Sequence, residues 1–238
     1  MRVIINGFLT QVTFMANVFP VNCYLVEEEE GLTLIDAALP YSSKGILMVA
    51  ESIGKPITKI VLTHAHEDHL GALDSIKKVL LDVPVYISVR DNRLMNGDLS
   101  LDSHENQIPI KGGVPKKLKT RANILLKEGD LVGSLAVIES PGHTPGSISF
   151  YDTRSHALIA GDALQTRGGV AVAGEIKLRF PFPAFGTWSK ETALKSARKL
   201  VGYGPKLLAV GHGEMIENPV KAMEQAISNL EKKIDRSK

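Results

Sequence analysis

Cysteine is almost absent from this chain, because Cys23 is the single one among 238 residues. One cysteine excludes an internal disulfide and any zinc site built from several thiolates. Cys23 lies on a predicted strand, where a free cysteine usually packs as a small buried hydrophobe. Metal chemistry in this chain therefore has to come from histidine and carboxylate side chains.

Excess charge and long apolar runs are also missing. The 28 basic and 26 acidic residues give a net charge of +2, which offers no electrostatic basis for binding nucleic acid. No apolar run is long enough to span a membrane, and polar residues interrupt the apolar ones near the N-terminus, so we expect no signal peptide. We therefore expect a cytoplasmic enzyme that acts on a small molecule and binds neither membrane nor nucleic acid.

No repeat, low-complexity segment or separating linker divides the sequence, and its length suits one or two domains. Predicted strands cover residues 8–14, 21–27, 31–36, 58–62, 84–88, 124–126, 131–138, 147–151, 157–161 and 206–210. Predicted helices cover residues 42–53, 69–81, 189–202 and 218–235, whereas 96–120 and 164–187 are predicted to be loops. In each half of the sequence the predicted strands come first and the predicted helices last. This order predicts one α/β domain over residues 1–238 with two packed sheets.

The most unusual stretch is Thr63-His64-Ala65-His66-Glu67-Asp68-His69, which follows a predicted strand. Three histidines and one aspartate lie within six residues there. These side chains are poor core residues, and burying four of them together costs desolvation unless something pairs them. One or two metal ions are the obvious partner, and imidazole with carboxylate suits zinc, iron and manganese alike.

Three more ligand-type residues stand beside glycine at the ends of predicted strands. His143 lies in the run PGHTPG, Asp162 ends the run LIAGD, and His212 lies in the run VGHG. Glycine lets the backbone turn tightly and leaves room at a site. Each residue alone is weak evidence, but together with the first run they favour a metal site. The two remaining histidines, His104 and His156, lie in a polar segment and a predicted turn and are not predicted ligands.

These motifs resemble, in order and spacing, the metallo-β-lactamase-fold hydrolase superfamily across nearly the whole chain. The runs THAHEDH and PGHTPG, with Gly161-Asp162 and Gly211-His212, carry the resemblance. The early segment Leu34-Ile35-Asp36 is also similar to one of the family's first strands. The resemblance implies a four-layer αββα sandwich of two mixed sheets, with helices on the outer faces and the metals at one edge.

The resemblance also implies two divalent ions, with Zn²⁺ first and Mn²⁺ or Fe²⁺ as alternatives, and it divides the ligands between them. The implied ligands of the first ion are His64, His66 and His143. Those of the second ion are Asp68, His69 and His212, and Asp162 is the implied bridge between the two ions. Asp36 is expected to orient a ligand through hydrogen bonds, as metal sites usually need. The alternative for Asp36 is a strand-end residue that caps a turn.

The bridging aspartate separates branches of the superfamily. The best-known β-lactamases carry a cysteine at the second metal, whereas this chain has its cysteine near the N-terminus. The aspartate is similar to that of glyoxalase II, lactonases and related ester or thioester hydrolases. Quorum-signal lactonases typically have a tyrosine shortly after this aspartate, where the present chain has Ala163-Leu164-Gln165. The resemblance thus implies a hydrolase of ester, thioester or lactone bonds.

The expected reaction is attack of a metal-bridged hydroxide on the substrate carbonyl. Two divalent ions about 3.5–4 Å apart hold such a hydroxide and stabilise both the attacking and the developing oxygen. Asp68 is expected to orient the hydroxide and accept its proton. Two alternatives stay open, a mononuclear iron persulfide dioxygenase on the same fold and a catalytically silent metal-binding module.

Substrate selection is expected in the two loops over residues 96–120 and 164–187. The stretch 178–188 carries three of the seven phenylalanines and the only tryptophan. Arg179, Phe182 and Phe185 are the candidate substrate-binding residues, in an apolar pocket with Arg167 or Arg179 near an anionic group. The alternative is that these aromatics seal the core or form a dimer contact. The sequence leaves the choice between monomer and homodimer open.

Overall fold

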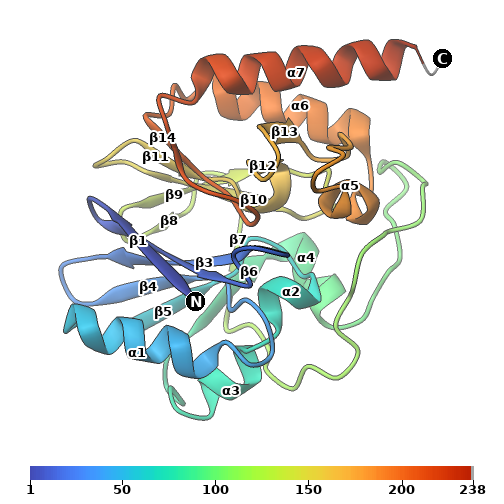
Figure 1. The fold of residues 1–238 in the computed structure, drawn as a ribbon. Coiled ribbons are helices and arrows are strands. Elements are labelled where there is room, and N and C mark those ends of the chain that lie inside the picture. Colours follow the sequence, from blue (N-terminus) through green and yellow to red (C-terminus); the bar gives the residue numbers. More distant parts are fainter. Residues whose placement is uncertain (237–238) are drawn as a thin grey trace. The chain divides into compact units, whose positions relative to one another are not determined.

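The computed structural model describes residues 1–236, and the last two residues of the predicted domain lie outside this range. The chain forms two compact units. Unit 1 comprises Met1–Asp98 with Gly113–Leu126, and unit 2 comprises Leu99–Gly112 with Lys127–Lys238. Each unit contains one large mixed sheet and its own helices (Figure 1). Over residues 1–236 no helix is both long and apolar enough to cross a membrane.

Unit 1 is built on a seven-stranded sheet in the order β1-β2-β3-β4-β5-β6-β7. Its strands are β1 (Arg2–Asn6), β2 (Leu9–Phe14), β3 (Val21–Glu27), β4 (Leu32–Ile35), β5 (Ile57–Val61), β6 (Val85–Ser88) and β7 (Ile124–Leu126). Strands β1 to β4 pair antiparallel, and β4 to β7 pair parallel. The parallel strands β4, β5 and β6 end on the same side of the sheet, which is where ligand-binding loops of such sheets lie.

The helices of unit 1 follow the parallel strands. They are α1 (Ser43–Ile53), α2 (Glu67–Leu70), α3 (Leu73–Lys77) and α4 (Val89–Met95). Helix α1 ends at Gly54, whose left-handed φ of 79° lets its N–H reach the carbonyls of Ala50 and Glu51. The predicted helix over residues 42–53 is confirmed at both ends.

The single helix predicted over residues 69–81 is wrong, because α2 and α3 are two short helices. The backbone of residues 37–40 approaches the chain at the break. Ala37 N–H donates to the His69 carbonyl at 2.7 Å, and Gly71 N–H donates to the Ala38 carbonyl at 2.8 Å. A Cβ on Gly71 would lie 2.6 Å from the Pro40 nitrogen, so this approach requires glycine. The His69 carbonyl thus accepts an N–H from outside the helix, whereas in a continuous helix it would accept an N–H from the next turn.

Cys23 lies on β3 and is fully buried, as predicted for a small hydrophobe. Its thiol donates weakly to the Val12 carbonyl at 3.8 Å. Burial raises the pKa of the Cys23 thiol well above its usual value, and the negative charge of Asp36 adds to the shift. The buried thiol therefore stays protonated at neutral pH.

Unit 2 contains a six-stranded sheet in the order β15-β14-β11-β10-β9-β8 and a separate pair, β12-β13. The strands are β8 (Leu131–Val132), β9 (Leu135–Glu139), β10 (Ile148–Asp152), β11 (Ala157–Ile159), β12 (Leu164–Gln165), β13 (Ala171–Val172), β14 (Leu207–Ala209) and β15 (Ile216–Glu217). Only β11 and β14 pair parallel among the named strands of this unit.

The helices of unit 2 are the 3₁₀ turn η1 (Gly161–Ala163), α5 (Phe182–Gly186), α6 (Lys190–Val201) and α7 (Val220–Asp235). Helices α6 and α7 lie side by side (Figure 1). Met223, Ile227 and Leu230 of α7 are buried in the core of this unit. Their spacing places them on one helical face, which explains why α7 packs along its length.

Short elements account for most of the remaining differences from the sequence prediction. Strand β1 was not predicted, and the predicted loop 164–187 contains β12, β13 and α5. The predicted strand 131–138 divides into β8 and β9 at Gly133, which has a φ of 61°. Elements of two to five residues are too short for a clear periodic pattern, so their contacts with neighbouring segments decide them.

Asp152, at the end of β10, gives the turn after it a pH-dependent stability. Burial raises the pKa of this carboxyl, but hydrogen bonds from the Arg154 side chain, at 2.8 Å, and from the backbone N–H groups of Arg154 and Ser155 outweigh it and lower the pKa. We expect Asp152→Asn to cost about 1 kcal/mol at pH 7. This difference should shrink as the pH falls through and below the unfolded value of about 3.9, because the stabilisation needs the ionised carboxylate. Urea unfolding of both proteins at pH 7 and pH 3 measures it, and an equal difference at both pH values would contradict it.

Candidate functional site

Three histidines pack together in unit 1 directly after β5. The ring centroids of His64 and His66 lie 4.9 Å apart, and those of His64 and His69 lie 4.1 Å apart. All three side chains are buried. Apolar packing has no need for three adjacent imidazoles, so this arrangement fits a group that binds a cation.

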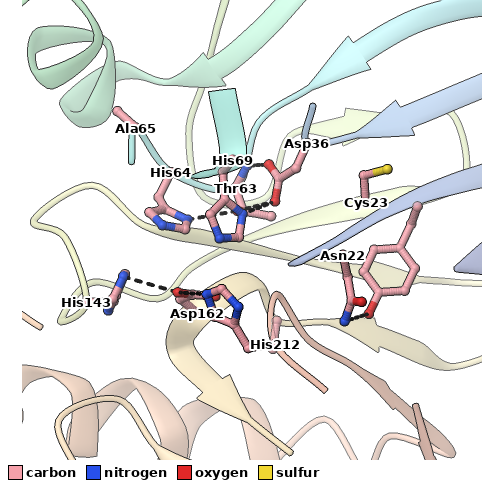
Figure 2. A network of polar contacts seen from close by, with 12 residues as sticks. Asn22, Cys23, Asp36, Thr63, His64, Ala65, His69, His143, Asp162 and His212 are labelled. Carbon is pink, nitrogen blue, oxygen red and sulfur yellow. Dashed lines mark hydrogen bonds and ion pairs between the residues drawn. The ribbon is translucent and has the colours of Figure 1, made fainter. Parts of the chain in front are cut away.

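The Asp36 carboxylate contacts the His69 imidazole and Thr63, which precedes the three histidines. It follows β4 with a left-handed φ of 62°. Its Oδ1 accepts the Thr63 N–H, and its Oδ2 accepts the Thr63 hydroxyl and faces His69 Nδ1, each at 2.8 Å (Figure 2). A carboxylate only accepts hydrogen bonds, so His69 carries its proton on Nδ1 and keeps the lone pair of Nε2 for a metal.

The tautomer of His64 follows from the same contacts. The Thr63 hydroxyl donates its hydrogen to Asp36, while His64 Nδ1 lies 3.0 Å from the same hydroxyl oxygen. The hydroxyl oxygen therefore accepts from His64, which puts the proton of a neutral imidazole on Nδ1. His64 Nε2 then carries the lone pair, as His69 Nε2 does, and each of these nitrogens could bind a metal ion.

Unit 2 contributes a second donor group, in which two imidazoles meet one carboxylate. Nε2 of His143 lies 3.3 Å from Asp162 Oδ2, and Nε2 of His212 lies 3.2 Å from the same oxygen (Figure 2). His143 lies between β9 and β10, Asp162 in η1, and His212 after β14. Each of the three is at most 5% exposed. The strand ends of unit 2 thus bring all three of its predicted ligands together.

Thr187, which the sequence did not indicate, orients His143. The Thr187 hydroxyl donates to the Pro183 carbonyl at 2.7 Å, and His143 Nδ1 lies 3.2 Å from that hydroxyl oxygen. A neutral His143 therefore donates from Nδ1 and directs the lone pair of Nε2 at Asp162. A lone pair facing a carboxylate oxygen is repulsive unless a cation joins them. The donor set of unit 2 therefore fits a metal ion.

Glycine and backbone hydrogen bonds fix the loop that carries His143. Gly142 has a φ of 141°, and a Cβ there would collide with the backbone of Ala193. The carbonyls of Gly142 and His143 accept the N–H groups of Ser189 and Trp188 at 2.9 and 3.0 Å. The PGH motif thus combines a ligand with the close approach of its loop to the start of α6.

Asp68, the predicted proton acceptor, lies on α2 and is partly buried. It borders a cavity of about 490 Å³ in unit 1, whose walls include Leu39, Leu70, Leu118 and Lys116. This volume falls in the usual range for small-molecule pockets. This cavity was not predicted from the sequence, because its walls come from three separate segments of the chain.

The predicted substrate-binding residues are exposed in unit 2. Phe182 and Phe185 of α5 are 52% and 61% exposed, and Arg179 is exposed just before them. Phe180 and Trp188 are buried instead, and the Phe180 ring lies 5.4 Å from that of His212. The alternative in which these aromatics seal the core holds for Phe180 and Trp188 and is wrong for Phe182 and Phe185.

Comparisons with curated proteins place the chain among metallo-hydrolases. Residues 16–212 match the metallo-β-lactamase superfamily. YobT of Bacillus subtilis (strain 168) is 53% identical over 232 residues, which cover 98% of this chain and 100% of YobT. The probable metallo-hydrolase YflN of the same strain is 32% identical over 229 residues, covering 88% of this chain and 83% of YflN. A hydroxyacylglutathione hydrolase of Hamiltonella defensa is 31% identical over 151 residues, covering 62% of this chain and 45% of that protein.

Solved structures agree with this placement. TTHA1623 in a di-iron-bound form aligns with a TM-score of 0.65 and 29% identity, covering 89% of this chain and 96% of that one. The DIM-1 metallo-β-lactamase aligns with a TM-score of 0.73 over 97% of each chain, but at 16% identity this likeness shows the fold alone. The predicted fold class is confirmed, and the chain belongs to the metallo-β-lactamase superfamily.

Proposed function

We propose that this protein is a dinuclear metal-dependent hydrolase of ester, thioester or lactone bonds. In this proposal the donor groups of the two units combine in one centre, and the chain acts as a single functional domain. The first ion would be held by His64, His66 and His143, the second by Asp68, His69 and His212, and both by Asp162. Zinc is the first expectation for both ions, with manganese or iron as alternatives.

One observation supports this proposal most directly: the Asp162 carboxylate oxygen lies within 3.3 Å of two imidazole nitrogens. Neutral His143 presents a lone pair to that oxygen, since its Nδ1–H donates a hydrogen bond to the Thr187 hydroxyl. In unit 1 the Nδ1 contacts of His64 and His69 likewise leave Nε2 for a metal. Orientation of the imidazoles by such hydrogen bonds is usual in metal sites.

The relatives support the same class of reaction. The family contains probable metallo-hydrolases, and one relative is named for hydrolysis of an acyl derivative of glutathione. TTHA1623 was solved with two iron ions, which supports a pair of metals and keeps iron among the candidates. The family membership supports hydrolysis in general, and the acyl substrate class belongs to the proposal.

The side chains of this protein would have distinct tasks in the reaction. When bound, two divalent ions polarise the substrate carbonyl and lower the pKa of water toward about 7. Asp68 would orient the attacking water and accept its proton. The cavity beside Asp68 offers apolar walls for the part of the substrate that does not react. Arg179, Phe182 and Phe185 are proposed to contact the substrate from unit 2, where their exposure leaves them accessible.

Metal analysis followed by a substrate panel tests the proposal. We expect about two ions per chain and hydrolysis of at least one class among lactones, thioesters and aryl esters, with phosphoesters and β-lactams as controls. One iron per chain with oxygen consumption on a persulfide would instead identify a persulfide dioxygenase. Failure to bind any metal would contradict the proposed hydrolase and favour a catalytically silent binding or sensor module. The cytoplasmic location and the choice between monomer and homodimer stay predictions.

Asp68→Asn separates the role in proton transfer from the role in metal binding. We expect the rate to fall by about 10²-fold, because a positioned acid or base typically contributes that much or more. The measurement is kcat at constant metal occupancy, checked by metal content. Asp82→Asn is the matched control, because Asp82 is an exposed aspartate of unit 1 that does not line the cavity beside Asp68. An Asp68→Asn protein with both ions and the wild-type rate would remove Asp68 from the mechanism.

A further inference from the structure

A buried aspartate outside the predicted ligand set holds the backbone between His64 and His66. Asp91 lies in the first turn of α4 and is fully buried. Its Oδ2 accepts the N–H of Ala65 at 2.9 Å. Its own N–H donates to Ser88 Oγ at 3.0 Å, which fixes the turn that carries it.

Asp91 is one of three acceptors that hold every second N–H of the ligand loop. The N–H of Thr63 donates to Asp36 Oδ1 at 2.8 Å, and that of Glu67 donates to the Gly113 carbonyl at 2.7 Å. The N–H of Ala65 lies between them along the chain and donates to Asp91. Asp36 follows β4 and Asp91 follows β6, the strands on either side of β5.

The hydrogen bond to Ala65 acts on a specific peptide unit. The N–H of Ala65 belongs to the planar group that joins His64 to Ala65, so an acceptor on this hydrogen restricts rotation of the backbone just after His64. The N–H of Glu67 belongs in the same way to the group that follows His66. Anchors placed after both histidines limit the directions in which the two imidazoles can point.

We propose that Asp91 is a positioning residue that sets the geometry of the His64–His66 pair for metal binding. The proposal rests on the proposed function, since it takes these histidines as ligands. Partners of this kind, which orient the ligands of a metal, typically change metal affinity 10- to 100-fold when they are removed. Asp91 is fully buried and bonded to the backbone, so it acts through the loop.

Zinc affinity and a cobalt spectrum test this role without any substrate. Asp91→Ala is expected to bind Zn²⁺ about 10- to 100-fold more weakly in competition with a chromophoric chelator. It should also shift or broaden the d–d absorption bands of the Co²⁺-loaded protein, which report ligand geometry. Asp91→Asn keeps an oxygen acceptor but loses the charge, which accounts for roughly half of such a bond's strength. Its affinity should therefore fall about three- to tenfold.

Asp152→Ala is the matched control, because Asp152 is also a buried aspartate that accepts backbone N–H groups, in a turn of unit 2 without ligands. It should lose stability toward urea while keeping the wild-type zinc affinity and cobalt spectrum. Wild-type affinity and spectrum in folded Asp91→Ala would overturn the proposal. If that variant does not fold, Asp91→Asn decides, and unchanged affinity and spectrum in it would overturn the proposal equally. A wild-type protein that binds no metal would instead defeat the proposed function itself.

Discussion

Asp162→Ala is expected to lose at least one of two bound ions and to slow hydrolysis by about 10³-fold. On the proposed assignment Asp162 serves both ions, and its Oδ2 lies within 3.3 Å of His143 Nε2 and His212 Nε2. Metal ions contribute several kcal/mol of transition-state stabilisation, and each 1.36 kcal/mol is a factor of ten in rate. Metal content per chain and kcat/KM on the substrate found by the panel give the two readouts.

The control for Asp162 is a histidine outside both donor groups. His104 is exposed in the segment 96–120, so His104→Ala should keep the metal content and the rate of the wild type. Two ions per chain and an unchanged rate in Asp162→Ala would show that this carboxylate is not a shared ligand. Loss of one ion with little loss of rate would assign catalysis to the other ion alone.

Asp36→Ala is expected to weaken both the fold and the metal site. The substitution orphans three donors, the N–H and hydroxyl of Thr63 and His69 Nδ1. Unsatisfied buried donors cost about 1–3 kcal/mol each, so the free energy of unfolding of the metal-free protein should fall by on the order of 3 kcal/mol or more. Zinc affinity should fall about 10- to 100-fold, because His69 loses the partner that orients it. Urea unfolding and chelator competition measure the two effects.

Asp36→Asn removes the charge and one acceptor oxygen while keeping the other. Asparagine tolerates the left-handed φ of 62° at this position, so the backbone stays compatible while one of the two acceptor oxygens is replaced by a donor. We expect an intermediate loss in both measurements. If Asp36→Ala lowers stability but leaves zinc affinity unchanged, Asp36 only caps the turn after β4, which was the alternative drawn from the sequence.

The sequence revealed the candidate ligands because their types are conspicuous where they occur. Histidine and aspartate directly after apolar strands have no packing role, so His64, His143 and Asp162 stood out without any structure. Long helices were equally predictable, since α6 is preceded by the N-cap residue Ser189, whose side chain accepts the Thr192 N–H, and runs for several turns.

What the sequence did not reveal depends on neighbours far away in the chain. Thr187 is 44 residues from His143, and Asp91 is 26 residues from Ala65. The pattern from Ser88 to Asp91 marks a helix start, but nothing in it shows which backbone N–H the carboxylate meets. The break after α2 likewise arises from contact with residues 37–40. A local sequence pattern predicts local structure, whereas these features depend on contacts between residues that are far apart in the sequence.

The break between α2 and α3 also bears on how the protein tolerates mutation. The segment after Asp36 is tied to the segment of His69 by two main-chain hydrogen bonds, from Ala37 N–H and from Gly71 N–H. Most side-chain substitutions leave such bonds intact, because every residue except proline keeps its N–H. Random mutation in this region can therefore vary most side chains without separating the two segments. The sensitive changes are proline at position 37 and any side chain at Gly71, so this segment is a robust support for His69, the proposed ligand.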